Sequence, residues 1–599
     1  MFVTHDGGDT WEERTEKHGL PEGELGRIGL AIAPSKPKVV YALVEAKKNA
    51  LYRSDDGGFK FKKVADENIG NRPFYYADIY VDPQNENRLY NLYSLVSKSE
   101  DGGKTFEVIL PYNSIHPDHH AFYIHPENPD FLIDGNDGGM AISRDRGETW
   151  QFIETLPLAQ FYHINHDMAL PYNVYGGMQD NGSWIGPSQV WQSGGIRNSH
   201  WEEVMFGDGF DVIPDPKNNR FGYAMYQGGN VYRYDKETGH SEYIQPFHPE
   251  GKALRFNWNA AIEQDPQNDC TLYFGSQFLH KSEDCGQSWE IISPDLTSND
   301  TAKQKQAESG GLTIDATRAE NFTALTAIEL SPKNQDVIWT GSDDGYLHVT
   351  VDGGENWNRV DTKIKDMPPG SWIPFIQASP YNEKEVLVVV NDYRRNNWEP
   401  YLFKSSDLGK SWTRLVNSEK VEGHALSVAW DPVEPNLIFL GTDRGLWYSL
   451  NGGSEWNKWT KGYPSTPTRD LKIHPRDHDL VIGTFGRAAW ILDDISPLRS
   501  MASDASILDS DFHVFKSSLP GYQVFKKAAA GVRFTGEGVF VGENKTTSLP
   551  ITVFIKRLID YESLSKEEKE ANKTPDHLQG KIVVHIKNEL GDTLRTFWV

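Results

Sequence analysis

Carboxylate and amide side chains gather beside glycines at three points of the sequence, and they are the residues best suited to chemistry. Gln179, Asp180 and Asn181 stand in a row, Asp208 lies between two glycines, and Asp137 belongs to a Gly-Asn-Asp-Gly segment. Asp and Asn beside Gly also form turns readily, so a purely structural role is the competing interpretation for each of them. Three successive polar side chains exceed the needs of a turn, which favours a binding or catalytic role for residues 179–181.

The chemistry that converging carboxyl groups suit is general acid and base catalysis, in which at least one of the pair needs a pKa raised by burial. Asp180 or Asp208 facing Asp137 would supply this pair, and these three residues are the catalytic candidates. The sequence contains no nucleophile and base at a spacing that would indicate a peptidase or a lyase.

Other polar and aromatic residues are expected to share one face of the protein with these carboxylates. The full set of binding candidates is Gln179, Asp180, Asn181, Asp208, Asn257, Asn259, Asp343, Asp344, Trp372 and Arg487. A mixture of carboxylates, amides, an arginine and an aromatic residue suits recognition of a sugar or a peptide. For Arg487, an ion pair that links neighbouring sheets is the alternative interpretation.

Histidines and repeated aspartates raise the question of a metal site. His119 and His120 are adjacent, and neighbouring residues of a strand point to opposite faces, so they are not expected to share a metal. The Asp-x-Gly spacing that recurs in the chain resembles a calcium loop but lacks the glutamate at position 12 of an EF-hand. The sequence therefore predicts no metal site and no cofactor.

A short turn motif recurs along the chain and predicts the elements that position these residues. The motif, an Asp-box, reads Ser/Thr-x-Asp-x-Gly-x-Thr/Ser-Trp/Phe. Its acidic position is occupied by Asp6, Asp56, Asp101, Asp145, Asp284, Asp352, Asp407 and Asn451. The carboxylate accepts turn N–H groups, the glycine supplies a positive φ, and the aromatic ring packs back on the turn. These aspartates are therefore predicted to be structural.

The spacing of the motif predicts an all-β fold of tandem β-propellers. The first four copies begin 44 to 50 residues apart, close to the ~40–45 residues of a four-stranded propeller blade. A solenoid is the rival, but four short strands per repeat fit blades better. We expect about ten blades: a complete seven-bladed propeller over 160–495, and the last three to four blades of an incomplete one over 1–155. Because an open ring exposes strand edges, upstream residues are expected to be missing.

The last part of the chain differs in character. Residues 512–599 contain short alternating runs, interrupted by a charged segment at 561–573 that is expected to be helical. We predict a small β-sandwich of Ig-like type for this region.

Composition excludes some partners. The chain has 60 Lys and Arg against 85 Asp and Glu, a net charge of −25, which repels nucleic acid and anionic lipid. No apolar run approaches the roughly 20 residues that cross a membrane, and the first residues do not resemble a signal peptide. Cys270 and Cys285 flank an expected hairpin and could form a disulfide in an oxidising compartment; two unpaired cysteines are the other interpretation.

Several segments together resemble a bacterial family of BNR/Asp-box propeller proteins. These segments are GMQDNGSW, ISPDLTSND, GSDDGYLHVTVDGGENW and GTFGRAAWILDDISPLR, and the resemblance covers roughly residues 1–500. The family is related in fold to the sortilin-type receptor domain and to the two-propeller xyloglucanases. The resemblance implies an exported protein of two propellers whose first blades are absent here. It assigns no catalytic residue, because the two aspartates of the xyloglucanases cannot be placed by motif.

Two functions follow from these observations. The first is a non-catalytic extracytoplasmic scaffold that binds a protein or glycan ligand. The alternative is a glycoside hydrolase that acts on a polysaccharide in the cleft between the propellers. On the sequence alone the scaffold is preferred, since a propeller by itself implies no chemistry.

Overall fold

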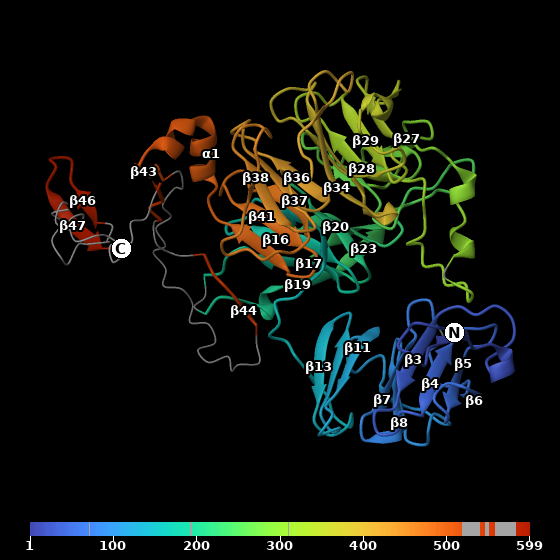
Figure 1. Ribbon diagram of the computed structural model, residues 1–599. Helices are drawn as coiled ribbons and strands as arrows, with labels where there is room; N and C mark the ends of the chain where they lie inside the picture. The colour runs from blue at the N-terminus through green and yellow to red at the C-terminus, as the bar shows by residue number, and fades with distance from the viewer. Residues whose placement is uncertain are drawn as a thin grey trace. The chain divides into compact units, whose positions relative to one another are not determined.

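Antiparallel strands make up nearly all of the structure (Figure 1). The computed structural model describes residues 1–70, 72–191, 194–309, 311–517, 540–545, 550–556 and 583–598. Within these residues there are nine four-stranded sheets and one three-stranded sheet, each with its strands in sequence order. The predicted all-β, blade-like fold class is confirmed.

Three of the four-stranded sheets precede residue 155. Their strands, with the short hairpin before them, are β1 (Phe2–Val3), β2 (Glu12–Glu13); β3 (Ile28–Ile32), β4 (Val40–Val44), β5 (Ala50–Ser54), β6 (Lys62–Ala65); β7 (Asp78–Asp82), β8 (Asn85–Leu92), β9 (Val96–Ser99), β10 (Glu107–Leu110); β11 (His119–Ile124), β12 (Leu132–Asn136), β13 (Gly139–Ser143), β14 (Gln151–Phe152). Polar turns separate these strands. The strands are rich in apolar residues because both faces of a sheet pack against neighbouring sheets.

Seven further sheets follow. Their strands are β15 (Phe161–His166), β16 (Asn173–Met178), β17 (Gly182–Pro187), β19 (Glu202–Met205); β20 (Gly209–Pro214), β21 (Phe221–Tyr226), β22 (Asn230–Asp235), β23 (His240–Tyr243); β24 (Ile262–Gln264), β25 (Leu272–Gly275), β26 (Leu279–Ser282), β27 (Glu290–Ile291); β28 (Leu325–Leu330), β29 (Ile338–Ser342), β30 (Leu347–Thr350), β31 (Asn358–Arg359); β32 (Trp372–Ala378), β33 (Val386–Asp392), β34 (Asn397–Ser405), β35 (Thr413–Arg414); β36 (Ala425–Trp430), β37 (Ile438–Thr442), β38 (Gly445–Ser449), β39 (Asn457–Lys458); and β40 (Thr468–Ile473), β41 (Leu480–Thr484), β42 (Ala489–Leu492).

These seven sheets close on themselves. The backbone of Gln160, just before β15, pairs with Phe485, just after β41. The side chain of Asp470 in β40 accepts a hydrogen bond from the backbone N–H of Ile164 in β15 at 3.0 Å. The first strands of neighbouring sheets lie beside one another, so they form the inner wall of the ring.

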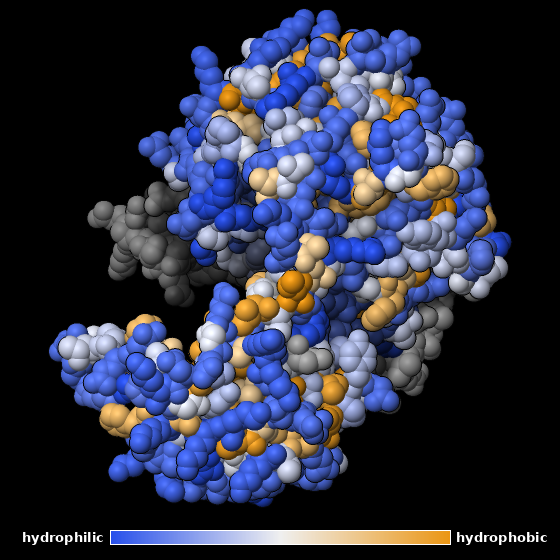
Figure 2. Space-filling model, turned by 90° about the vertical axis from the view of Figure 1, so that its right-hand side faces the viewer, coloured by the Kyte–Doolittle hydropathy of each residue, from blue (hydrophilic) through white to orange (hydrophobic). Residues whose placement is uncertain are grey.

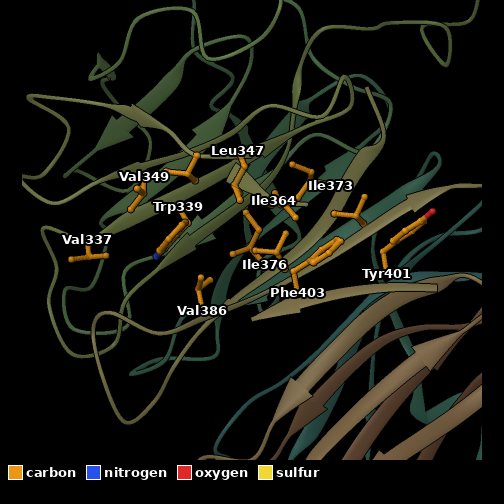
Figure 3. Packing of buried hydrophobic residues seen from close by; sticks show 14 residues of the cluster. Val337, Trp339, Leu347, Val349, Ile364, Ile373, Ile376, Val386, Tyr401 and Phe403 are labelled. Carbon is orange, nitrogen blue, oxygen red and sulfur yellow. The ribbon is translucent and has the colours of Figure 1, made fainter. Parts of the chain in front are cut away.

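Apolar side chains fill the space between neighbouring sheets. Figure 3 shows one such cluster, which contains Trp339 of β29, Ile373 and Ile376 of β32, and Phe403 of β34. Trp339 is fully buried. Burial of a large aromatic side chain contributes several kcal/mol, on the order of 25 cal/mol per Å² of apolar surface. Comparable clusters join the other neighbouring sheets, so the packing is radial.

The repeated turn joins the third and fourth strands of a sheet. In the turn between β34 and β35, the Ser405 hydroxyl donates to Asp407 at 2.9 Å and accepts the backbone N–H of Gly409 at 2.9 Å. Asp407 in turn accepts the backbone N–H of Ser411 at 2.8 Å. The same three hydrogen bonds occur in all eight copies. The motif therefore closes each turn locally, at the end of the sheet opposite to the candidate site.

The structure joins Cys270 and Cys285 in a disulfide, with their Cα atoms 4.0 Å apart. Cys270 precedes β25 and Cys285 follows β26, so the bond crosses the base of this hairpin. The backbone N–H of Cys285 also donates to the carbonyl of Cys270 at 2.9 Å.

Helices are short in the described part of the chain. They are α1 (Ser496–Ser503) and the 3-10 helices Glu16–His18, Asn198–His200, Thr301–Lys303, Gln306–Glu308, Asp361–Lys363, Tyr393–Arg395 and Ala505–Asp509. None of these is long and apolar enough to cross a membrane.

The chain divides into two compact units, and the second contains the residues around 496–517 and 550–598. Its described strands form two pairs, β43 (Phe512–Val514) with β45 (Val553–Ile555) and β46 (Val583–Lys587) with β47 (Thr593–Trp598). Most of the expected β-sandwich, and the expected helix at 561–573, lie outside the described residues.

One segment of the expected C-terminal domain belongs to the first unit instead. Strand β44 (Val541–Gly542) pairs with β18 (Ile196–Arg197), which lies in the connection between β17 and β19 of the first sheet of the ring. Lys545 also forms ion pairs with Asp479 at 2.9 Å and with Asp493 at 3.5 Å. These contacts attach residues 540–545 to the ring.

Candidate functional site

Asp137, Asp180 and Asp208 come together although 71 residues of sequence separate the first from the last. Asp180 lies in the turn between β16 and β17, and its backbone N–H donates to Oδ1 of Asp208 at 2.8 Å. Asp137 lies in the turn between β12 and β13, and its backbone carbonyl accepts from the side-chain amide of Asn181 at 2.9 Å. Asp137 and Asp180 lie in turns between the second and third strands of their sheets, and Asp208 lies just before the first strand of its sheet. These positions are at the same end of the sheets.

The electrostatics of the three carboxyl groups are unequal. Burial, together with the charges of Asp208 and Asp137, raises the pKa of Asp180 to about 8. A carboxyl group with that pKa carries its proton at neutral pH and can act as an acid. Asp208 is buried, while Asp137 is only partly covered. The arrangement therefore places one carboxyl group of raised pKa beside two other carboxyl groups.

The N-terminal sheets and the ring meet at this site. His116, in the loop before β11, contacts the backbone carbonyl of Asp180 through Nε2 at 2.9 Å. The contact continues elsewhere, because Arg72 pairs with Asp315 at 2.7 Å and Glu45 accepts two hydrogen bonds from Thr313. Both halves of the first unit thus contribute to the site.

The two adjacent histidines separate as expected from strand geometry. His119 is buried and contacts Asp134 at 2.8 Å, whereas the exposed His120 contacts Asp137 at 3.4 Å. The hydrogen bond that His120 donates to the Asp137 carboxylate raises the pKa of His120. Among the described residues, no group of three or more His, Cys, Asp or Glu side chains is placed to hold a metal ion.

Tyr162 connects the carboxylates to a second, basic part of the same face. Its hydroxyl contacts Oε1 of Gln179 at 2.5 Å, and its ring lies 5.4 Å from the guanidinium of Arg469. Burial raises the pKa of Tyr162 to about 12 while Arg469 opposes the shift. Gln179, Asp180, Asn181 and Asp208 therefore lie together, as the sequence analysis expected for one face.

Three of the other binding candidates form a separate group. Asn257 donates to Asp343 at 2.9 Å, and Asp344 accepts the backbone N–H of Ser298 at 2.8 Å. Burial raises the pKa of Asp343 to about 8. The backbone N–H of Asn259 donates to Asn257 at 3.0 Å, while its side chain contacts His163 at 2.8 Å. Their side chains are occupied by neighbouring protein groups, which favours a structural role for Asn257 and Asp343.

Trp372 is covered by a residue that the sequence analysis did not single out. The guanidinium of Arg394, in the turn between β33 and β34, lies 3.5 Å from the Trp372 ring and 4.5 Å from the Tyr393 ring. The signal was present as Tyr-Arg-Arg-Asn-Asn-Trp in a second-to-third turn. Arg487 is exposed, and the described residues include no ion-pair partner for its guanidinium.

Charged side chains on the inner strands were also missed. His163 of β15 lies 3.8 Å from Asp211 of β20 and 3.4 Å from Asp470 of β40. Burial raises the pKa of Glu263 in β24 to about 7 despite the opposing charge of Lys472. Their spacing along the chain carries no recognisable pattern, because each comes from a different sheet and only ring closure brings them together.

None of the predicted residues lines the pocket of about 590 Å³ in this part of the ring. It is lined by Gly228, Gln245, Pro246, Phe247, His248, Gly251, Lys252, Leu254, Phe256, Arg318 and Asn321. The face of the molecule in Figure 2 is mainly hydrophilic, and its apolar residues form small groups. Apolar groups of that size are usual on soluble proteins and do not by themselves indicate an interface.

The fold and this site define an all-β protein built of propeller sheets, with a protonated carboxyl where its two groups of sheets meet. No protein-family model matches the chain. Over 184 residues it is 24% identical to "Xyloglucanase Xgh74A" of Acetivibrio thermocellus, a match that covers 29% of this chain and 21% of the relative. Over 263 residues it is 24% identical to an oligoxyloglucan-reducing end-specific xyloglucanase of Emericella nidulans, covering 39% of this chain and 31% of the relative. The aligned part is thus less than a third of each relative.

Solved structures of similar proteins carry related descriptions. A GH74 enzyme of Niastella koreensis is 15% identical, with 76% of this chain and 75% of that chain covered and a TM-score of 0.21. A GH74 xyloglucanase of Xanthomonas campestris is 13% identical, with 78% and 98% covered and a TM-score of 0.19. An ancestral GH74 enzyme is 12% identical, with 80% and 79% covered and a TM-score of 0.26.

The matches favour one of the two functions expected from the sequence. The curated relatives are named as xyloglucanases, which supports the glycoside hydrolase alternative over the non-catalytic scaffold that the sequence alone preferred. These matches support the resemblance to the xyloglucanases. The resemblance to the sortilin-type receptor domain stays a prediction.

Proposed function

We propose that this chain hydrolyses a glycosidic bond of a polysaccharide, with Asp180 as the acid. The observation that carries the proposal is the meeting of Asp180 with Asp208 and Asp137, which gives Asp180 a pKa of about 8. A glycosidase acid must hold its proton at the working pH, and burial beside other carboxylates is how enzymes achieve this. The sequence matches to xyloglucanases support the same reaction class.

The residues then take distinct roles. Asp180 donates its proton to the oxygen of the leaving sugar, and Asp208 keeps that proton in place through its charge and its hydrogen bond to the Asp180 turn. Asp137 is our candidate for the base that activates the attacking water, since it is partly exposed and comes from the other group of sheets. His120 contacts this carboxyl group at 3.4 Å and would help to orient it.

An extracytoplasmic location is part of the proposal. Disulfides persist mainly in oxidising compartments, and the Cys270–Cys285 bond is consistent with one. In that location the protein would also encounter a polysaccharide substrate.

The test is turnover of xyloglucan by the wild type and by Asp180→Asn, measured as released reducing ends. Asn keeps the size of the side chain but cannot donate the catalytic proton, so kcat should fall by at least about 100-fold, the usual value of general acid catalysis. Asp215→Asn is the matched control, because Asp215 lies at the opposite end of β20 and only accepts backbone N–H groups of its own turn. It should retain wild-type turnover.

A negative result has a clear meaning. If the wild type binds xyloglucan but releases no reducing ends, the scaffold function replaces the hydrolase. If Asp180→Asn and Asp215→Asn turn over equally, the acid has been assigned to the wrong residue.

A further inference from the structure

Two arginines of the seven-sheet ring have no acidic partner among the described residues. Arg394 lies in the turn between β33 and β34, and Arg469 lies near the start of β40, at the same end of the sheets. In the described part of the chain neither guanidinium forms an ion pair or donates a hydrogen bond, whereas the adjacent Arg395 binds Asp392 at 2.6 Å.

Aromatic rings hold both guanidinium groups in position. Arg394 stacks on Trp372 and Tyr393, and Arg469 lies over Tyr162. Contacts of a guanidinium with an aromatic face orient the group without satisfying its N–H donors. The donors of both residues therefore stay available to a ligand.

The surroundings of the two arginines do not neutralise them. Burial lowers the pKa of Arg394, and the positive charge of Arg469 lowers it further. The two guanidinium groups therefore repel each other. His424 stacks on Tyr393 between them, and burial together with the two arginines lowers its pKa to about 4, so it is neutral at pH 7. Asp343, whose charge acts on Arg394, is bound by Asn257 and by the backbone N–H of Ala324, and Asp443 faces His424 at 3.4 Å.

We propose that Arg394 and Arg469 bind a carboxylate group of an acidic oligosaccharide. A planar carboxylate accepts two parallel hydrogen bonds from a guanidinium, which is the pairing that arginine is best suited to make. Trp398, which is 54% exposed, lies 5.6 Å from His424 and 6.0 Å from Tyr393 and offers an uncovered ring for a pyranose. The ligand class is therefore a uronic-acid-containing glycan; the choice of a glycan over an acidic peptide rests on the proposed function.

Tyr162 places this basic site next to the carboxylates. Its ring contacts Arg469 and its hydroxyl contacts Gln179, which directly precedes Asp180. A polysaccharide with uronic acid side groups could bind the arginines through a carboxylate while a neutral part of its chain reaches Asp180. This would add charge selectivity to a hydrolase whose relatives are named for xyloglucan.

The test is calorimetric titration of the Asp180→Asn protein, which should not turn over ligand, with trigalacturonate and with its methyl ester. We expect the acid form to bind at least about 10-fold more tightly than the ester, and Arg394→Gln and Arg469→Gln each to weaken trigalacturonate by about 10-fold, the value of a charged hydrogen bond. Arg220→Gln is the control, because this arginine pairs with Asp235 in another sheet. It should change binding by less than about 2-fold.

Each contrary outcome overturns the inference. Equal binding of the acid and its ester, unchanged binding in both arginine variants, or no binding at all removes the carboxylate site. Tighter binding of pentaglutamate than of trigalacturonate would replace the glycan with an acidic peptide. If trigalacturonate binds as expected and wild type leaves xyloglucan intact, the proposed hydrolysis fails and the anion site stands.

Discussion

The backbone N–H of Asp180 donates to the Asp208 carboxylate at 2.8 Å, while the two side chains lie close enough for Asp208 to raise the pKa of Asp180. Asp180 adopts a positive φ of 58°, a conformation that Asp tolerates better than most residues. The turn thus fixes one carboxyl against another before any substrate arrives. Such preorganisation is the usual way in which a protein keeps a carboxylic acid protonated at neutral pH.

The first prediction concerns the pH dependence of turnover. Because Asp180 must be protonated and its pKa is about 8, kcat should be constant at neutral pH and fall above pH 8. Asp208→Asn removes one of the charges that raise this pKa, so the alkaline limb should move to lower pH. Rate profiles of both proteins on xyloglucan measure the shift. An unchanged limb in Asp208→Asn would show that another group titrates.

The second prediction concerns stability at the same residue. The folded-state pKa of Asp180 lies above its ordinary value of 3.8, so the folded state loses stability as pH rises from about 4 to about 8. Asp180→Asn cannot ionise and should therefore raise the melting temperature at pH 9 while leaving it nearly unchanged at pH 4. Calorimetric melting at both values checks this. A lower melting temperature at pH 9 would contradict the raised pKa.

The third prediction concerns the repeated turn. Ser405 is 1% exposed, and its hydroxyl bonds both Asp407 and the backbone N–H of Gly409. Ser405→Ala should destabilise the turn by about 1–3 kcal/mol, because it leaves a buried N–H without a partner. Hydrogen exchange of peptides covering 400–415 measures the effect. Ser411→Ala, which removes an exposed contact to the same Asp407, should cost much less.

The fourth prediction concerns the disulfide. Cys270 and Cys285 are 15 residues apart, and a loop of that length is stabilised by about 3 kcal/mol when closed. Cys270→Ser combined with Cys285→Ser should lower the melting temperature of the ring. Thiol labelling of the unfolded wild type should find free cysteines only after reduction. Labelling without reduction would mean that the bond does not form.

The sequence by itself determined the elements. The eight turns from Thr4 to Trp456 predicted the third-to-fourth strand connections, because each motif is closed by hydrogen bonds among residues at most four apart. Local chemistry of this kind is readable from a chain without its fold.

Only the tertiary structure decided which of the many Asp and Asn residues act together. Asp180 and Asn257 occupy similar sheet-end positions, yet one meets two other carboxyls and the other is bound to Asp343. Arg394 and Arg469 are 75 residues apart and face the same opening because the sheets close into a ring. Burial, charge proximity and the lack of a partner are properties of that closure, and no spacing in the sequence encodes them.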